Sequence, residues 1–413
     1  MQTPPPSEEA SDIRTGGTGH RVVIVGAGLA ALRTAEELRR AEYTGAITLV
    51  GREEHLPYDR PPLSKEVIRG ERDNTTLKSL EFFQENRIEL RLGVAADGVD
   101  TARRQVQLAD GSTVPYDDLI VATGLVPRRL NGLPQLRGVH VLRTLDDALA
   151  LRLDLARSKR ALVVGAGFIG CELAASIRSC GVEAVLIDVQ PTPLAEVLGE
   201  EVGRLLERLH VAEGVDVRCG VGLQSLTGDE RVTGAVLTDG TQVEADVVVL
   251  GVGSLPVTDW LEGSGLQLAD RSAGGGVLAD ECGRTNIPHV WATGDVAAWR
   301  HATGRHRRVE HWSNAGDQAR ILASALLDAD VRGTTQVPFF WSDQYGLKIQ
   351  AFGHPSRDHT VHILEDDGRA FLACYASEGV LTAVVGAGRP REVVKLRAKV
   401  AAAAPIEDIL APS

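Results

Sequence analysis

Short apolar runs that end in glycine-rich turns dominate the early part of the chain. The first run, VVIV at residues 22–25, leads into GAGLAA at 26–31 and then into apolar positions at helical spacing through Leu38. Unbroken apolar runs of this length are typical of strands buried on both faces of a parallel sheet. Together with a second apolar run at 47–50, the pattern predicts one strand–turn–helix–strand unit.

The same pattern returns farther along the chain. The run ALVV at 161–164 leads into GAGFIG at 165–170, a helical spacing through Ile177 and an apolar run that ends at Asp188. Repetition of this unit is typical of a chain with two nucleotide-binding domains. The predicted fold class is therefore α/β, with two Rossmann-like nucleotide-binding domains.

A different pattern begins after residue 333. Alternating apolar and polar positions predict four strands, at 348–352, 359–364, 371–375 and 380–385. Apolar positions at helical spacing follow between residues 393 and 400. The end of the chain is therefore predicted to form a small α+β domain.

Composition and charge exclude several classes of protein. The chain has 413 residues, with 44 Lys and Arg against 56 Asp and Glu, and a net charge of −12, which argues against a general nucleic-acid-binding protein. The five cysteines are scattered, with no CxxC pair and no metal-ligand spacing, so we expect free thiols in the cytoplasm and no metal site. No apolar run reaches the roughly 18 residues of a membrane span, and we expect no membrane partner.

The two glycine-rich turns are candidate pyrophosphate sites. Glycines in a GxGxxG/A turn let the backbone approach a pyrophosphate, and the following helix directs its N-terminus at the negative charge. An ordinary tight turn could use the same glycines, but both turns here have the required strand before them and helix after them.

Acidic residues at the strand ends help to discriminate between nucleotides. Asp188 lies 23 positions after Gly165, where a carboxylate accepts hydrogen bonds from ribose hydroxyls. No arginine follows within two residues to hold a 2′-phosphate, so NADH is favoured over NADPH; a solvated aspartate is the alternative. In the first unit the acidic residue does not directly follow the strand: Arg52 comes first, and the carboxylate is that of Glu53. Glu53 could equally be a surface charge.

Five further motifs follow one another in a fixed order. They are PYDRPPLSK at 57–65, IVATG at 120–124, LRT at 142–144, TGD at 293–295 and WSDQY at 341–345. This series resembles the FAD-dependent, NADH-using ferredoxin reductases of bacterial oxygenase systems, over a stretch from about Arg21 to at least Tyr345. The resemblance implies that NADH delivers a hydride to FAD. Single electrons then pass to an iron–sulfur ferredoxin that serves a monooxygenase or dioxygenase.

The resemblance also implies the domain organisation of glutathione-reductase-like flavoproteins. An FAD-binding domain comprises residues 20–126 and 252–332, and an NADH-binding domain of residues 127–251 interrupts it. The α+β domain then spans 333–413, and residues 1–19 form a disordered lead-in.

Roles for individual residues follow from the same resemblance. Lys65 and Glu172 are the expected catalytic residues: Lys65 brings positive charge to the flavin ring, and Glu172 lies near the nicotinamide and pairs with Lys65. The expected FAD-binding residues are Gly26, Gly28, Ala30, Glu53, Arg60, Lys65, Ala96, Thr123, Gly124, Arg143, Asp295 and Trp312. The expected NADH-binding residues are Gly165, Gly167, Phe168, Ile169, Gly170, Glu172, Asp188, Gly251 and Gly253.

Some of these assignments have structural alternatives. Arg60 could be a surface cation, and Trp312 could belong to the core. Phe168 either covers the flavin until nicotinamide displaces it or simply packs a helix on a strand. Arg52 replaces the acidic residue common in the family, which puts the adenosine contacts in question.

Other functions remain as alternatives. The missing dithiol excludes relatives that need paired redox cysteines, and the first cysteine, Cys171, lies inside the second glycine turn, which disfavours single-cysteine NADH oxidases. An NADH-responsive flavoprotein that resembles apoptosis-inducing factor, or an NADH oxidase, is the alternative function. A basic run is the candidate docking site for an acidic ferredoxin, with a solvated loop as the alternative. Its arginines are Arg300, Arg305, Arg307 and Arg308.

Overall fold

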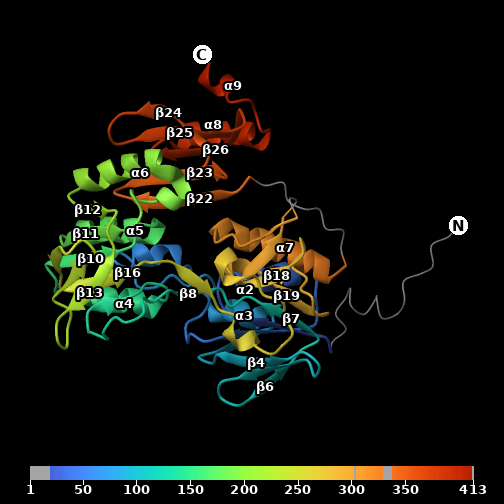
Figure 1. Cartoon of the computed structure of the whole chain (residues 1–413). Helices are drawn as coiled ribbons and strands as arrows, with labels where there is room; N and C mark the ends of the chain where they lie inside the picture. Colours follow the sequence, from blue (N-terminus) through green and yellow to red (C-terminus); the bar gives the residue numbers. More distant parts are fainter. Residues whose placement is uncertain (1–18, 302–303, 329–336, 412–413) are drawn as a thin grey trace. The chain divides into compact units, whose positions relative to one another are not determined.

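The computed structural model describes residues 19–301, 304–328 and 337–411. The chain folds into two compact units, each assembled from separate segments (Figure 1). Unit 1 contains the described parts of residues 1–59, 75–126 and 255–335, and unit 2 contains those of 60–74, 127–254 and 336–413. The expected lead-in at 1–19 lies outside the described residues except for Gly19, and the expected domain boundaries stay a prediction.

A five-stranded parallel sheet forms the centre of unit 1. Its strand order is β19-β7-β1-β2-β3. The strands are β1 (Arg21–Val25), β2 (Ala46–Gly51), β3 (Ile88–Leu92), β7 (Asp118–Val121) and β19 (Val290–Ala292). Helix α2 (Leu29–Arg40) joins β1 to β2 and packs against α7 (Trp312–Leu326). The predicted first strand–turn–helix–strand unit is therefore confirmed.

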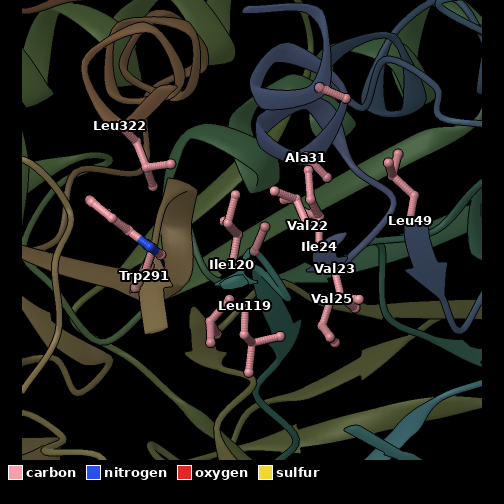
Figure 2. Close-up of a cluster of buried hydrophobic side chains, with 14 of the residues drawn as sticks. Val22, Val23, Ile24, Val25, Ala31, Leu49, Leu119, Ile120, Trp291 and Leu322 are labelled. Atoms are coloured by element: carbon pink, nitrogen blue, oxygen red, sulfur yellow. The ribbon is translucent and has the colours of Figure 1, made fainter. Parts of the chain in front are cut away.

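The core of unit 1 lies between this sheet and its helices. Figure 2 shows Ile24 of β1, Ile120 of β7 and Leu322 of α7, all completely buried. The indole of Trp291 on β19 belongs to the same core and donates a hydrogen bond to Asp118 on β7, at 2.9 Å. Strand β1 pairs with a parallel strand on each side, β2 and β7. Strands of parallel sheets are buried on both faces, which explains why the sequence of β1 does not alternate between apolar and polar residues.

Smaller elements complete unit 1. They are α3 (Leu80–Glu85), the antiparallel strands β4 (Ala96–Asp100), β5 (Gln105–Leu108) and β6 (Thr113–Pro115), the strands β18 (Val277–Ala279), β20 (Ala297–Arg300) and β21 (His306–Arg307), and the 3-10 turns η2 (Asp259–Leu261), η3 (Arg271–Ala273) and η4 (Gly294–Val296). The short strands β8 (Leu125–Pro127) and β17 (Ser254–Pro256) contain two of the points at which the chain passes from one unit to the other.

Unit 2 repeats the parallel sheet in its first part. The strand order is β12-β11-β10-β16-β9, with β9 (Val139–His140), β10 (Arg160–Val164), β11 (Glu183–Asp188), β12 (Asp216–Cys219) and β16 (Val247–Leu250). The helices are α4 (Leu145–Leu155), α5 (Phe168–Ser179) and α6 (Ala195–Ala212), and the 3-10 turn η1 spans Pro61–Ser64. An antiparallel sheet of β13 (Leu223–Thr227), β14 (Gly234–Leu237) and β15 (Gln242–Glu244) is inserted before β16. The predicted second repeat is confirmed.

The C-terminal part of unit 2 is an antiparallel sheet with a helix on it. Its order is β22-β23-β26-β25-β24, from β22 (Phe339–Gln344), β23 (Leu347–Gly353), β24 (Thr360–Asp366), β25 (Phe371–Ser377) and β26 (Val380–Ala387). Helix α8 (Pro390–Ala401) packs against β23 and β26, and α9 (Glu407–Leu410) follows. The predicted α+β character and its four strands are confirmed, and the WSDQY motif forms most of a fifth strand, β22.

Candidate functional site

The first glycine turn is packed tightly against the residues that follow β7 on one side and is open at the N-terminus of α2 on the other. Gly26 has φ +123°, and a Cβ at this position would lie 2.1 Å from the carbonyl oxygen of Ala122. Gly28 is the N-cap of α2, and a Cβ there would meet no atom within 4 Å. The turn therefore packs tightly on the end of β7 and presents an uncovered helix N-terminus, which fits a pyrophosphate.

The TGD motif lies against this turn. A Cβ on Gly294 would be 2.7 Å from the Cβ of Ala30, so the motif directly contacts the start of α2. The Gly294 N–H donates to Gln318 Oε1 at 2.8 Å. Thr293 is completely buried, and its hydroxyl has no hydrogen-bond partner among the described residues. Asp295 follows, half-buried, so the structure brings Ala30 and the TGD motif together as the sequence predicts.

Local contacts fix Thr123 and Gly124. The Thr123 hydroxyl donates to the Val257 carbonyl oxygen at 2.7 Å, and the Val257 N–H donates to the carbonyl of Gly124 at 3.0 Å. These bonds hold the loop after β7 against the loop after β17. Any contact of the two residues with FAD stays a prediction.

The remaining FAD candidates of unit 1 have different surroundings. Glu53 accepts a hydrogen bond from the Tyr58 hydroxyl at 2.5 Å, and Ala96 begins β4, half-buried. Trp312 is 38% exposed at the start of α7, and its indole donates to Asp59 at 2.7 Å. The alternative that Trp312 belongs to the core is therefore wrong.

The second glycine turn, in unit 2, repeats the geometry of the first. Gly165 has φ +104°, and a Cβ there would lie 2.3 Å from the carbonyl oxygen of Gly251. A Cβ on Gly170 would lie 1.8 Å from the carbonyl oxygen of Gly165, whereas one on Gly167, the N-cap of α5, would meet no atom within 4 Å. Gly253 also has a positive φ and an open Cβ direction. This turn too fits a pyrophosphate.

Asp188 is fixed at the end of β11 beside this turn. Its two carboxylate oxygens accept backbone hydrogen bonds, one from Ala166 at 2.6 Å and one from Gln190 at 2.8 Å. The carboxylate is half-buried, and the next residue, Val189, is 69% exposed. Asp188 is thus held against the glycine turn rather than left as a freely solvated side chain, which fits a ribose-binding role.

Lys65 and Glu172 form the expected ion pair. Lys65 Nζ lies 2.7 Å from Glu172 Oε2, and the two residues are only 5% and 3% exposed. The ammonium also donates to the carbonyl of Pro61 at 3.1 Å. Buried charges are tolerated only when they are paired and hydrogen-bonded, and this pair meets both conditions. The predicted pairing is confirmed.

Two serines that the sequence interpretation missed complete the surroundings of Glu172. Ser64 donates to Oε2 at 2.5 Å, and Ser342 of β22 donates to Oε1 at 2.7 Å. Both serines are almost completely buried. Each lies inside one of the five motifs, so their positions in PYDRPPLSK and WSDQY were the available signal.

Arg60 and Arg143 meet within unit 2. The Arg60 guanidinium donates to the Arg143 carbonyl oxygen at 2.5 Å, and the Arg143 N–H donates to Asp147 at 3.0 Å. Asp147 and Thr144 form the capping box of α4, which fixes the LRT motif at the start of this helix.

Phe168 packs a helix against a strand. Its ring lies edge-on to that of Phe340 on β22, with centroids 5.1 Å apart. This contact agrees with the packing alternative for Phe168. The neighbouring Ile169 is 44% exposed.

Comparison with known proteins identifies the family. The model of the pyridine nucleotide-disulphide oxidoreductases matches residues 20–319. The chain belongs to this family. A second model, the reductase C-terminal domain, matches residues 339–411, so the likeness continues beyond the last of the five motifs.

Relatives of this oxidoreductase are ferredoxin reductases. The chain is 35% identical to a ferredoxin–NAD(P)(+) reductase of a Sphingomonas species, over 94% of this chain and 95% of the relative. It is 37% identical to the ferredoxin–NAD(+) reductase component of the p-cumate 2,3-dioxygenase system of Pseudomonas putida, over 85% of each chain. The covalent putidaredoxin reductase–putidaredoxin complex contains a chain with 30% identity and a TM-score of 0.89, with 95% of this chain and 96% of that one covered. The resemblance inferred from the motifs is confirmed.

The family is named for disulphide chemistry, but the cysteines of this oxidoreductase are free thiols. Cys171, beside Glu172, is buried, and burial holds the pKa of its thiol well above the usual value. A thiol that stays protonated is a poor nucleophile. Cys171 is therefore poorly suited to act as a redox nucleophile, and FAD and NAD(H) are the cofactors of the family.

Two arginines of the expected docking run are occupied in ion pairs. Arg300 lies 2.6 Å from Glu281, and Arg308 lies 2.8 Å from Glu310. Arg305 and Arg307 are exposed. The run therefore carries less unbalanced positive charge than the sequence indicates.

The described part of the oxidoreductase contains neither a candidate metal site nor a candidate membrane-spanning helix. No three His, Cys, Asp or Glu side chains there are grouped to hold a metal ion. Within the same residues, every helix is too short or too polar to cross a bilayer.

Proposed function

We propose that this oxidoreductase is an NADH-dependent ferredoxin reductase of an oxygenase system. Unit 1 binds FAD through its glycine turn and TGD motif, and unit 2 binds NADH through the second turn. Bound FAD accepts a hydride from NADH and releases electrons one at a time, which an iron–sulfur ferredoxin requires. The names and near-complete coverage of the relatives support this function, and the free thiols agree with a cytoplasmic location.

The observation that carries the proposal is the buried pair of Lys65 and Glu172. Glu172 lies in the second turn of α5, the helix that follows the glycine turn of unit 2, and Lys65 directly follows η1. A charge pair withdrawn from water is expensive to form, and a hydrophobic pair would fill the space at lower electrostatic cost. We infer that Lys65 supplies fixed positive charge for the flavin as it becomes reduced, and that Glu172 orients Lys65 and the nicotinamide.

Asp188 supports NADH over NADPH. Its carboxylate is fixed by two backbone N–H groups, so it cannot rotate away from an incoming 2′-phosphate without losing both bonds. The fixed carboxylate of Asp188 can accept hydrogen bonds from the ribose hydroxyls, and its negative charge repels a 2′-phosphate.

The remaining cofactor residues keep their proposed roles on the basis of their positions. Gly26, Gly28 and Ala30 form the first turn, with Thr123, Gly124 and Asp295 beside it, and Gly165, Gly167, Gly170 and Gly251 form the second. For Glu53, Arg60, Ala96, Arg143, Trp312, Ile169 and Gly253, the proposal rests on the family resemblance.

For the partner, we propose that Arg305 and Arg307 steer an acidic ferredoxin. Both side chains are exposed, and exposed charges raise the rate of encounter with an oppositely charged partner. Arg300 and Arg308 belong to the same basic run, and their acidic neighbours are Glu281 and Glu310.

Anaerobic spectroscopy tests this function. The purified protein should show the spectrum of bound FAD, NADH should bleach it in one rapid phase, and an oxygenase ferredoxin should restore it by one-electron steps. An NADH-responsive flavoprotein or an NADH oxidase would also be bleached by NADH. Negligible turnover of the FAD-loaded protein with every ferredoxin of oxygenase systems offered would overturn the proposal. In that case, fast turnover with oxygen in air would favour the NADH oxidase, and slow turnover would favour the NADH-responsive flavoprotein.

A further inference from the structure

The carboxylate of Glu172 receives hydrogen bonds from two separate parts of unit 2. Oε2 contacts Lys65 and Ser64, which come from the segment 60–74. Oε1 accepts only from Ser342, in the described part of the chain, at 2.7 Å. Without this serine, one oxygen of a buried carboxylate would have no donor, which is unfavourable.

Ser342 is itself held in place. The side-chain amide of Gln344 donates to the Ser342 hydroxyl at 3.1 Å, and the two residues are 0% and 1% exposed. A hydroxyl has a single proton. Because Gln344 uses the oxygen as an acceptor, that proton is directed to Glu172.

The strand that carries Ser342 is fixed against α5. Residues Phe339–Gln344 pair antiparallel with β23 along their whole length, and Phe340 contacts Phe168 at the start of α5. The hydroxyl therefore approaches Glu172 from a rigid element of the sheet rather than from a loop, which favours a defined carboxylate orientation.

From this geometry we propose that Ser342 is a positioning residue for reduction of the flavin by NADH. It fixes the carboxylate plane of Glu172, so that Oε2 stays directed at Lys65, and Gln344 fixes Ser342 in turn. The C-terminal sheet then contributes to the NADH-dependent half of the reaction. The inference rests on the proposed roles of Lys65 and Glu172.

Three variants at this position test the role. In anaerobic stopped-flow experiments at saturating NADH, Ser342→Ala should reduce its flavin about tenfold more slowly, equivalent to about 1.4 kcal/mol in the barrier. Ser342→Cys, which keeps the shape but is a weak donor, should be slowed similarly. Ser342→Thr, which keeps the hydroxyl, should recover most of the rate. In all three the Kd for NADH should change less than about twofold.

Ser377→Ala is the matched control, because Ser377 lies at the end of β25 in the same sheet. It should reduce its flavin at the normal rate. Rates are measured per bound FAD, so that a variant with poor folding or flavin content is still informative. If the Ala and Cys variants reduce bound FAD at the normal rate, the inference is overturned.

Glu172→Gln separates this inference from the proposed function. Slow reduction in Glu172→Gln with normal reduction in Ser342→Ala and Ser342→Cys would reject the positioning role alone. Normal reduction in Glu172→Gln would instead reject the role of Glu172 itself, and the inference with it.

Discussion

Lys65 Nζ lies 2.7 Å from Glu172 Oε2 in surroundings where both side chains are shielded from water. The two residues come from different segments of unit 2, the turn after η1 and the second turn of neighbouring α5. Because no water can replace a missing partner, the pair has consequences for stability as well as for chemistry.

Replacement of one member of the Lys65–Glu172 pair should lower the stability of the fold more than replacement of both. Lys65→Met or Glu172→Leu should each lower the free energy of unfolding by about 3 kcal/mol, because an unpaired buried charge remains. The double variant Lys65→Met/Glu172→Leu should recover at least half of this loss while it stays slow in flavin reduction. Urea unfolding followed by flavin fluorescence measures the stability. Additive losses in the double variant would contradict the coupling.

The steric requirement at the second glycine turn can be tested with alanine. Gly165→Ala should raise the Kd for NADH at least tenfold and leave bound FAD unchanged, because its Cβ would overlap the Gly251 carbonyl. Gly220→Ala is the matched control, since Gly220 also has a positive φ, +77°, but an open Cβ direction. It should lower stability by only about 1 kcal/mol and leave NADH binding intact. Equal effects on NADH binding would refute the steric argument.

Nucleotide preference should depend on the charge of Asp188. Asp188→Ala should lower kcat/KM for NADH about tenfold and raise the ratio of NADPH to NADH activity at least as much, since a carboxylate that repels a 2′-phosphate is lost. Asp239→Ala, at an exposed turn between β14 and β15, serves as the control. An unchanged ratio in Asp188→Ala would show that Asp188 does not contact the ribose.

Acid should destabilise unit 2 through His210. This histidine is completely buried on α6, and its Nδ1 forms a hydrogen bond with the Tyr345 hydroxyl. Burial lowers its pKa from 6.5 to about 4. The unfolded chain takes up the proton first, so stability is complete above pH 6.5 and falls as the pH approaches 4. The full loss amounts to about 3 kcal/mol.

The matched variant isolates this effect from other titrating groups. The pKa of His20 is raised by its hydrogen bond to Asp118, so His20 acts with the opposite sign and stabilises the fold below pH 6.5. The difference in unfolding free energy between the natural chain and His210→Gln, followed from pH 7 to 4, removes the contribution of His20. A difference that does not change with pH would contradict the assignment to His210.

Charge reversal should test the docking role of the exposed residues Arg305 and Arg307. Arg305→Glu/Arg307→Glu should lower kcat/KM for ferredoxin severalfold at low salt and flatten its salt dependence, with flavin reduction by NADH unchanged. Arg300→Glu, opposite Glu281, is compared with Arg305→Glu alone, which changes the net charge by the same amount, and should have the smaller effect. If flavin reduction by NADH slows equally, the docking role is wrong.

The parallel sheets and glycine turns were predictable because their sequence signals are local. Four apolar residues before Gly26 and before Gly165 specify a buried strand and a tight turn without reference to the rest of the chain. The Lys65–Glu172 pair was predictable only through the family resemblance, since nothing in the sequence between these positions indicates that they meet.

The partners of Glu172 could not be predicted from spacing. Ser64 and Ser342 are ordinary serines in sequence, and their importance depends on the packing that brings η1 and β22 against α5. The ion pairs that occupy Arg300 and Arg308 were missed for a similar reason, because Glu281 lies far from the basic run and nothing local marks Glu310 as a partner.

The segmented build of unit 2 limits how the protein can be divided. Glu172 lies in the segment 127–254, but Ser64 and Lys65 come from 60–74, and Ser342 comes from 336–413. A fragment of residues 127–254 would contain every element of the second parallel sheet, yet its buried carboxylate would have lost all three donors. Such a fragment should be a poor substitute for the native unit, and any split-protein or domain-exchange design has to transfer the three segments together.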